Sequence, residues 1–210
     1  MALAYLLSKP SAKLLKVNLN VPLVMVLSIL PDVDILLLPA LHRGPTHSLV
    51  TTVLVFIPVF VFYGKCAVPY FVAVISHSLI GDFFVGGQLL LFWPVTTRMF
   101  GLHELGSVYI GIESGLNVAV ELGLLVAAVF VLLKAADMHQ FFEVRKTNLA
   151  LAIPIFTVLL PTFVGYPFDA PILQTLPAAA VGHVFFLVLF AVSVVIALGG
   201  MLGKRKSVSG

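Results

Sequence analysis

Six long apolar stretches dominate the chain, and they are too many and too long to form the core of a water-soluble domain. A helix that crosses a membrane needs about 20 predominantly apolar residues. Of the 210 residues, 60% are hydrophobic and only 10% are charged, whereas a typical soluble domain carries roughly 25% charged residues. The sequence therefore predicts an all-α, polytopic membrane protein with about six transmembrane helices in a single membrane domain, residues 1–210. The stretches cover residues 21–41, 48–64, 67–92, 106–133, 148–165 and 178–202.

Lysine and arginine residues gather in alternate connections between these stretches. Short segments rich in Lys and Arg stay in the cytoplasm. With the N-terminus inside, ten of the twelve basic residues are cytoplasmic, and only Arg43 and Arg98 lie outside. This distribution predicts a multi-pass protein of the plasma membrane with both termini in the cytoplasm.

The two ends of the chain are basic and are expected to lie on the cytoplasmic side. Residues 1–20 form a cytoplasmic or interfacial segment, in which a short basic amphipathic helix could lie at the lipid headgroups. Pro10 argues against a single unbroken helix there. Residues 203–210 form a basic cytoplasmic tail.

The net charge of +3 does not indicate a nucleic-acid partner, because the basic residues lie at the ends of apolar runs and form no patch. Cys66 is the only cysteine, which excludes an intramolecular disulfide and a thiolate metal cluster. The expected partners are the lipid bilayer and a lipid-like substrate, and the oligomeric state is left open.

Ionisable residues within the apolar stretches crowd towards the outer side of the membrane. The first stretch is broken at Pro31-Asp32-Val33-Asp34, and irregular backbone at membrane depth is tolerated only where it is buried in protein or lines a polar cavity. Carboxylates and imidazoles suit zinc, manganese or iron. We therefore predict a divalent metal site, with zinc or manganese favoured. The candidate ligands are Asp32, Asp34, His42, His47, His77 and Asp82.

The string His42-Arg43-Gly44-Pro45-Thr46-His47-Ser48 is the strongest motif. Its Gly-Pro pair favours a tight turn, and either Thr46 or Ser48 can cap the helix that follows. Both histidines then lie at the mouth of a helix. His42 either binds the metal ion directly or supports a residue that does. Arg43 either anchors the chain at the lipid headgroups or holds a substrate phosphate.

These motifs resemble the membrane-bound metal-dependent hydrolases of the YdjM type, LexA-regulated inner-membrane proteins. The resemblance implies a metal site at these positions in a hydrolase that acts on phospholipid-like substrates. It covers roughly the N-terminal half of the chain. The matching residues are Pro31 to Asp34, His42 to Ser48, Ser76-His77 with Asp82, and Trp93-Pro94.

One spacing departs from the pattern of that family, in which the aspartate follows the histidine by four residues. Here Asp82 follows His77 by five, which on a regular helix separates the two side chains by about 140°. Two explanations are open. A π-bulge near Gly81 would restore the alignment. Alternatively, Asp82 supports one of the ligands and does not bind the ion itself.

The sequence thus predicts an enzyme that hydrolyses an ester at the outer face, with a phospholipid or lipid-linked phosphoester as substrate. Asp34 or Asp82 is the expected base and Arg43 the expected phosphate contact. The alternative is an ion- or proton-coupled transporter, which would need polar residues along a path through the whole bilayer. In a third hypothesis, the bound metal ion only holds helices together and takes no part in catalysis. The roles of Glu113, Asn117, Glu121 and His183 are left open between interhelical hydrogen bonds and the site.

The orientation makes a prediction for Cys66, which lies beside Lys65 in a short connection that we assign to the cytoplasm. A membrane-impermeant thiol reagent should leave Cys66 unlabelled in intact cells and label it after permeabilisation. Labelling before permeabilisation would reverse the orientation.

Overall fold

The computed structural model describes residues 1–37, 42–106 and 108–208, and side chains as far as residue 203. Regular structure in these ranges is helical except for one isolated bridge between Leu89 and Phe100, so the predicted all-α class is confirmed. Four stretches within the described residues are long and apolar enough to cross a membrane. They are Leu49–Asp82, Gly115–Lys134, Lys146–Val164 and Pro177–Gly203.

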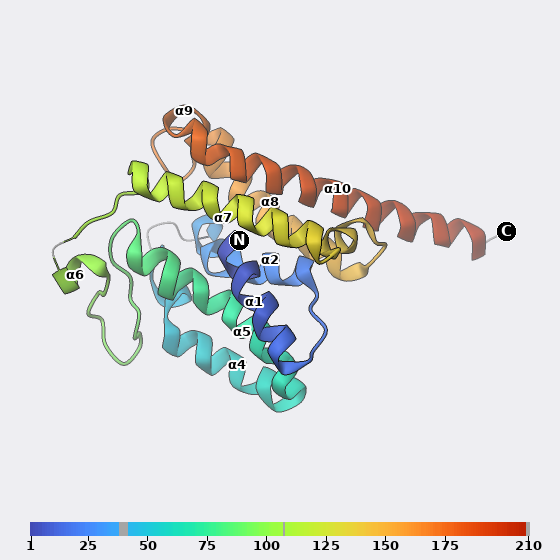
Figure 1. Ribbon diagram of the computed structural model, residues 1–210, viewed down its shortest axis with the longest axis horizontal. Helices are drawn as coiled ribbons and strands as arrows, with labels where there is room; N and C mark the ends of the chain where they lie inside the picture. The colour runs from blue at the N-terminus through green and yellow to red at the C-terminus, as the bar shows by residue number, and fades with distance from the viewer. Residues whose placement is uncertain (38–41, 107, 209–210) are drawn as a thin grey trace.

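The first of these stretches folds back on itself. Helix α4 (Leu49–Tyr63) ends at Gly64, whose φ of 53° lies in the left-handed region that favours glycine. After a short 3-10 turn, α5 (Val68–Ser76) returns alongside α4 (Figure 1). The rings of Phe56 and Phe71 are 5.3 Å apart, whereas one straight helix would separate these residues by about 22 Å. The predicted stretches 48–64 and 67–92 therefore begin with two separate helices.

The first predicted stretch contains a short, buried helix, α2 (Val21–Ile29). It is apolar on all sides and lies at the centre of the core, as expected for a helix surrounded by other helices. The α-helix ends before Pro31, where the chain continues as a 3-10 turn, η1 (Leu30–Val33), and then α3 (Asp34–Leu37). The predicted break is confirmed. Residues 38–41 of this stretch lie outside the described residues.

The N-terminal segment forms α1 (Ala2–Leu15), which continues through Pro10. The predicted interruption at Pro10 is therefore wrong: proline removes only one backbone hydrogen bond, and the packing of α1 against α5 and against α7 (Gly115–Lys134) holds the helix together. Tyr5 is fully buried, and its hydroxyl donates a hydrogen bond to Asp137 across 2.7 Å. One face of this basic segment is thus part of the core.

The C-terminal half supplies the rest of the bundle. Helix α7 (Gly115–Lys134) begins nine residues later than the predicted stretch 106–133, and α10 (Pro177–Val208) extends beyond the predicted stretch 178–202. The side chains of the predicted basic tail from Lys204 onwards lie outside the described residues. The remaining elements are α6 (Leu102–Gly106), η6 (Asp137–Phe142), η7 (Lys146–Leu151), α8 (Ala152–Leu159), η8 (Leu160–Val164) and α9 (Ile172–Thr175).

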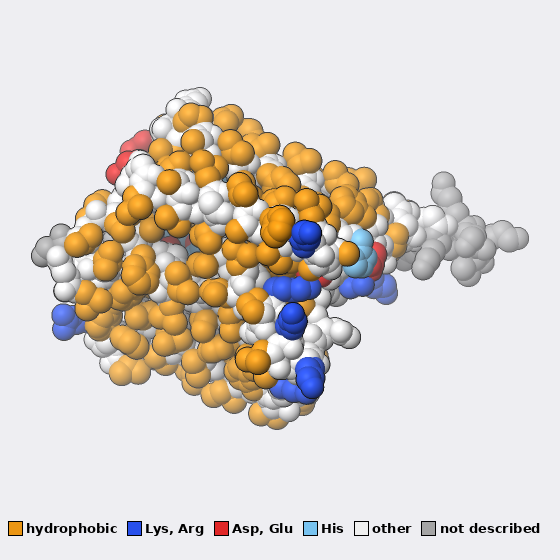
Figure 2. Space-filling model, viewed as in Figure 1, with side chains coloured by type: hydrophobic (Ala, Val, Ile, Leu, Met, Phe, Trp, Pro, Cys, Tyr) orange, Lys and Arg blue, Asp and Glu red, His pale blue; other side chains and the backbone are white. Residues whose placement is uncertain are grey.

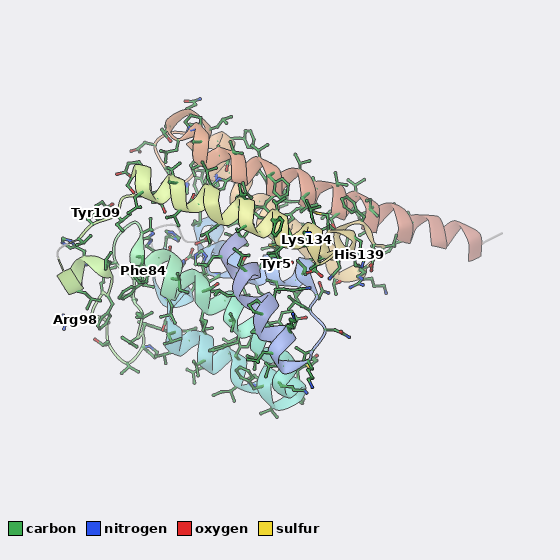
Figure 3. All side chains as sticks on the ribbon, in the orientation of Figure 1. Tyr5, Phe84, Arg98, Tyr109, Lys134 and His139 are labelled. Carbon is green, nitrogen blue, oxygen red and sulfur yellow. The ribbon has the colours of Figure 1, made fainter. Side chains whose placement is uncertain are left out.

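The surface of the bundle is apolar. Large hydrophobic side chains are exposed along α4, α7 and α10, and Phe62 keeps 81% of its surface accessible. Figure 2 shows hydrophobic side chains over most of the visible face, with most of the visible lysines and arginines towards one end. Lys134 and His139 lie near that end, whereas Arg98 and Tyr109 lie at the opposite one (Figure 3). An apolar surface of this extent is consistent with embedding in a membrane.

Candidate metal centre

Two aspartates and two histidines meet where η1, η3 (Pro45–His47) and the π-helix that follows α5, η5 (His77–Asp82), come together. The Nε2 atoms of His47 and His77 lie 3.2 and 3.0 Å from Oδ1 of Asp32. Both nitrogens also lie 3.3 Å from Oδ2 of Asp82. Nitrogen and oxygen therefore alternate around a small ring. We call Asp32, His47, His77 and Asp82 the Asp–His cluster.

Asp82 reaches this cluster because the chain from His77 to Asp82 is wound as a π-helix, η5 (His77–Asp82). In a π-helix hydrogen bonds connect residues five apart, so side chains at this spacing return to the same face. Of the two explanations for the unusual spacing, the π-bulge is therefore confirmed.

The backbone of the motif 42–48 is held at both ends. At its start, the carbonyl of Arg43 accepts a hydrogen bond from the amide of Leu90 at 3.0 Å. At its end, the side chain of Ser48 accepts a hydrogen bond from the amide of Thr51, so Ser48 is the predicted helix cap. The Ser48 hydroxyl also donates to the carbonyl of Trp93 across 2.6 Å. The loop before Trp93-Pro94 is thereby joined to the motif.

Arg43 lies against Asp82. Its guanidinium donates to Oδ1 of Asp82 at 3.3 Å and to the carbonyl of Val85 at 3.0 Å. The chain folds closely over it: a Cβ on Gly86 would lie 2.5 Å from a guanidinium nitrogen. Neither sequence hypothesis for Arg43 included this contact. It gives Arg43 a third role, which is to position Asp82.

Asp34 lies next to the Asp–His cluster and takes part in a network of hydrogen bonds. Its Oδ2 accepts a hydrogen bond from the Thr46 hydroxyl at 2.6 Å, and its Oδ1 lies 3.0 Å from Nδ1 of His42. The Thr46 oxygen is also 3.0 Å from Nδ1 of His47. Since the Thr46 hydrogen is given to Asp34, Thr46 can only accept from His47. This contact favours a proton on Nδ1 of His47 and leaves its Nε2 lone pair directed into the cluster.

The spacing of the donor atoms fits a small divalent ion. Two sets of side chains have donor atoms close enough to hold a metal, namely Asp32, His47 and His77, and Asp34, His42 and His47. Ligands at about 2.0–2.1 Å from a tetrahedral ion lie about 3.3 Å from one another, close to the separations in the Asp–His cluster.

The electrostatics of the site also fit a cation. Oδ2 of Asp82 is buried and, although two imidazole nitrogens lie 3.3 Å away, it accepts no hydrogen bond of good geometry from a described residue. Such an acceptor is costly unless something else satisfies it. With neutral imidazoles, the carboxylates of Asp32, Asp34 and Asp82 and the guanidinium of Arg43 sum to a charge of about −2, which one divalent ion would balance. The side chains of Asp32, His77 and Asp82 keep 14–16% exposure, so the cluster is not sealed.

Among the described residues, the other polar residues noted in the sequence make no hydrogen bond or ion pair with the cluster. The carboxylate of Glu113 folds back against Gly111. His183 is an interhelical partner, because its Nδ1 lies 2.9 Å from the hydroxyl of Thr162 on η8. The remaining contacts are Asn117 with the Ile112 carbonyl and Glu121, and His139 with Glu143.

No protein-family model matches the sequence, and comparisons with curated proteins and with solved structures found no match either. The functional interpretation therefore depends on the geometry of the site and on the motif resemblance.

The hydrogen-bond network makes a prediction for Thr46, which the sequence marked only as a potential cap. Thr46→Val keeps the shape but removes a hydrogen bond to a buried carboxylate, so we expect a loss of roughly 1–3 kcal/mol in the free energy of unfolding. Thr147→Val, at an exposed threonine far from the site, should change it by less than about 0.5 kcal/mol. Denaturation in detergent with a chelator present measures both, and equal stability of the two variants would contradict the network.

Proposed function

We propose that the Asp–His cluster binds a divalent metal ion and that the protein is a membrane-embedded, metal-dependent hydrolase. The observation that carries this proposal is the convergence of four donor atoms, with neighbouring nitrogen and oxygen atoms 3.0–3.3 Å apart. One of the four is Oδ2 of Asp82, which is buried and accepts no hydrogen bond of good geometry from a described residue. Two oxygens and two imidazole nitrogens suit zinc or manganese.

Each residue of the cluster has a distinct part in this proposal. Asp32, His47, His77 and Asp82 hold the ion, Thr46 orients His47, and Arg43 holds Asp82 in place. A metal bound here would supply Lewis-acid chemistry, polarising the substrate oxygen and lowering the pKa of water.

His42 is the proton acceptor in the proposed reaction, in place of Asp34 or Asp82. Both oxygens of Asp34 are already engaged by His42 and Thr46, and Oδ1 of Asp82 is held by Arg43. The Nδ1 atom of His42 faces Asp34, which leaves Nε2 available to take a proton. His42 is also the most exposed of the three histidines, with 24% of its side chain accessible.

The substrate we propose is an ester of a lipid, and the phosphoester of a phospholipid or lipid-linked compound fits best. The site lies near the end of α5 that is opposite to the Lys65 turn, about 15 residues or roughly 22 Å away along the helix axis. With the basic end in the cytoplasm, the proposed reaction takes place near the outer surface of the plasma membrane. The hairpin, the three other long helices and the broken first stretch make up the six proposed crossings.

Metal content is the first test. We expect the purified protein to hold about one divalent ion per chain, and His47→Ala and His77→Ala should each lower the content severalfold, because a lost ligand is rarely replaced. His139→Ala removes a histidine that is 64% exposed at the other end of the molecule and should change nothing. Elemental analysis measures all four proteins. If the metal content is the same in all of them, the ligand assignment is wrong.

Activity is the second test, with zinc or manganese added to detergent-solubilised protein and with phospholipids and soluble phosphoesters as substrates. His47→Ala should lose both metal and turnover. His42→Ala should keep the metal and lower turnover by roughly 10²- to 10⁴-fold, the usual contribution of a general base. If no ester is cleaved with any metal, yet proteoliposomes carry a cation or proton flux that Asp32→Asn abolishes, the protein is a transporter.

A further inference from the structure

A second polar site lies at the other end of α2 from the metal centre. It is a cavity of about 600 Å³ between α1, the segment 17–19 that leads into α2, and η6. This volume is typical of a site for a small molecule or a lipid headgroup. Its lining residues are Lys9, Ala12, Lys13, Val17, Asn18, Leu19, Asp137, His139, Gln140 and Arg145.

The floor of the cavity is built from buried groups with fixed partners. Asp137 is buried, with one oxygen 2.5 Å from Nζ of Lys9 and 2.7 Å from the Tyr5 hydroxyl. Gln140 is also buried, and its side chain accepts a hydrogen bond from the amide of Val21 at 3.0 Å. The charge of Asp137 is thus already compensated within the protein.

The mouth of the cavity carries the remaining positive charge. Lys13 is exposed and makes no ion pair with any described residue. Arg145 uses its Nε atom for Glu143, which leaves four N–H groups at the end of its guanidinium. Lys9, Lys13 and Arg145 carry three positive charges and Asp137 and Glu143 carry two negative charges, which leaves a net charge of about +1. This is the charge that a single phosphodiester anion would balance.

We propose that this cavity binds a phosphate-bearing anion, with Lys13 and Arg145 as its main contacts. A phosphodiester carries one negative charge, and a guanidinium offers paired donors to its oxygens. The cavity lies at the basic end of the bundle, where basic pockets between membrane helices meet lipid headgroups. The apolar side chains of Val17 and Leu19 line the same space and suit the carbon chain of a lipid. This site is independent of the proposed hydrolase activity.

Native mass spectrometry of the full chain in a neutral detergent tests the proposal. The wild type should retain phosphatidylglycerol in preference to phosphatidylcholine. Lys13→Gln with Arg145→Gln should weaken that binding by roughly tenfold or more, because two positive charges are lost beside the phosphate. The matched control is Lys65→Gln with Lys134→Gln, which removes two positive charges outside the cavity lining and should bind as the wild type does.

Competition with inorganic phosphate identifies the source of the anion. If phosphatidylglycerol stays bound in millimolar phosphate, the ligand is a lipid headgroup; if phosphate displaces it in the wild type, free phosphate is a ligand of the same site. Equal binding of the two lipids by the wild type would overturn the proposal. So would equal binding of phosphatidylglycerol by the wild type and the Lys13 and Arg145 double variant. If that variant does not fold, Lys13→Gln alone makes the same comparison with a smaller loss.

Discussion

Charge compensation at Asp32, Asp34 and Asp82 determines how the ends of several helices meet. A carboxylate in an apolar bundle is costly unless it is paired, and each of the three has partners from another part of the chain. Arg43 supports both Asp82 and the Val85 carbonyl, so one guanidinium connects the motif 42–48 to the end of the π-helix and to the turn beyond it. A second polar network lies at the opposite end of α2, and the core around α2 separates the two.

The motif residues could be predicted from the sequence because their signals are local. Gly-Pro favours a turn, and Ser48 precedes an apolar helix, so the positions of the histidines at a helix mouth follow from neighbouring residues. The burial of α1 could not be predicted in this way. Its lysines indicate a surface helix, whereas Tyr5 is buried by a contact with Asp137, 132 residues further along the chain. Long-range contacts of this kind override local patterns.

The spacing between His77 and Asp82 shows what a local rule can and cannot determine. The five-residue interval indicated that either the helix or the role of Asp82 was unusual, but it could not decide between them. A π-helix is locally less favourable than an α-helix, and it persists where contacts with the surrounding residues compensate for this cost. Here the contacts are those of Asp82 with Arg43, His47 and His77. Arg43 and His47 lie outside the helix that contains Asp82, so the periodicity of that helix could not reveal their contacts.

The exposure of the site residues suggests the side from which a substrate approaches. His47 is fully buried, Asp32, His77 and Asp82 keep 14–16% of their side-chain surface, and His42 keeps 24%. Accessibility therefore increases from the middle of the cluster towards His42. A bound ester would meet the metal ligands on their open side and His42 at the rim, where an imidazole fixed by Asp34 can take a proton without leaving its hydrogen bond. In the proposed reaction, the less exposed residues would hold the ion and His42, the most exposed residue of the site, would take the proton.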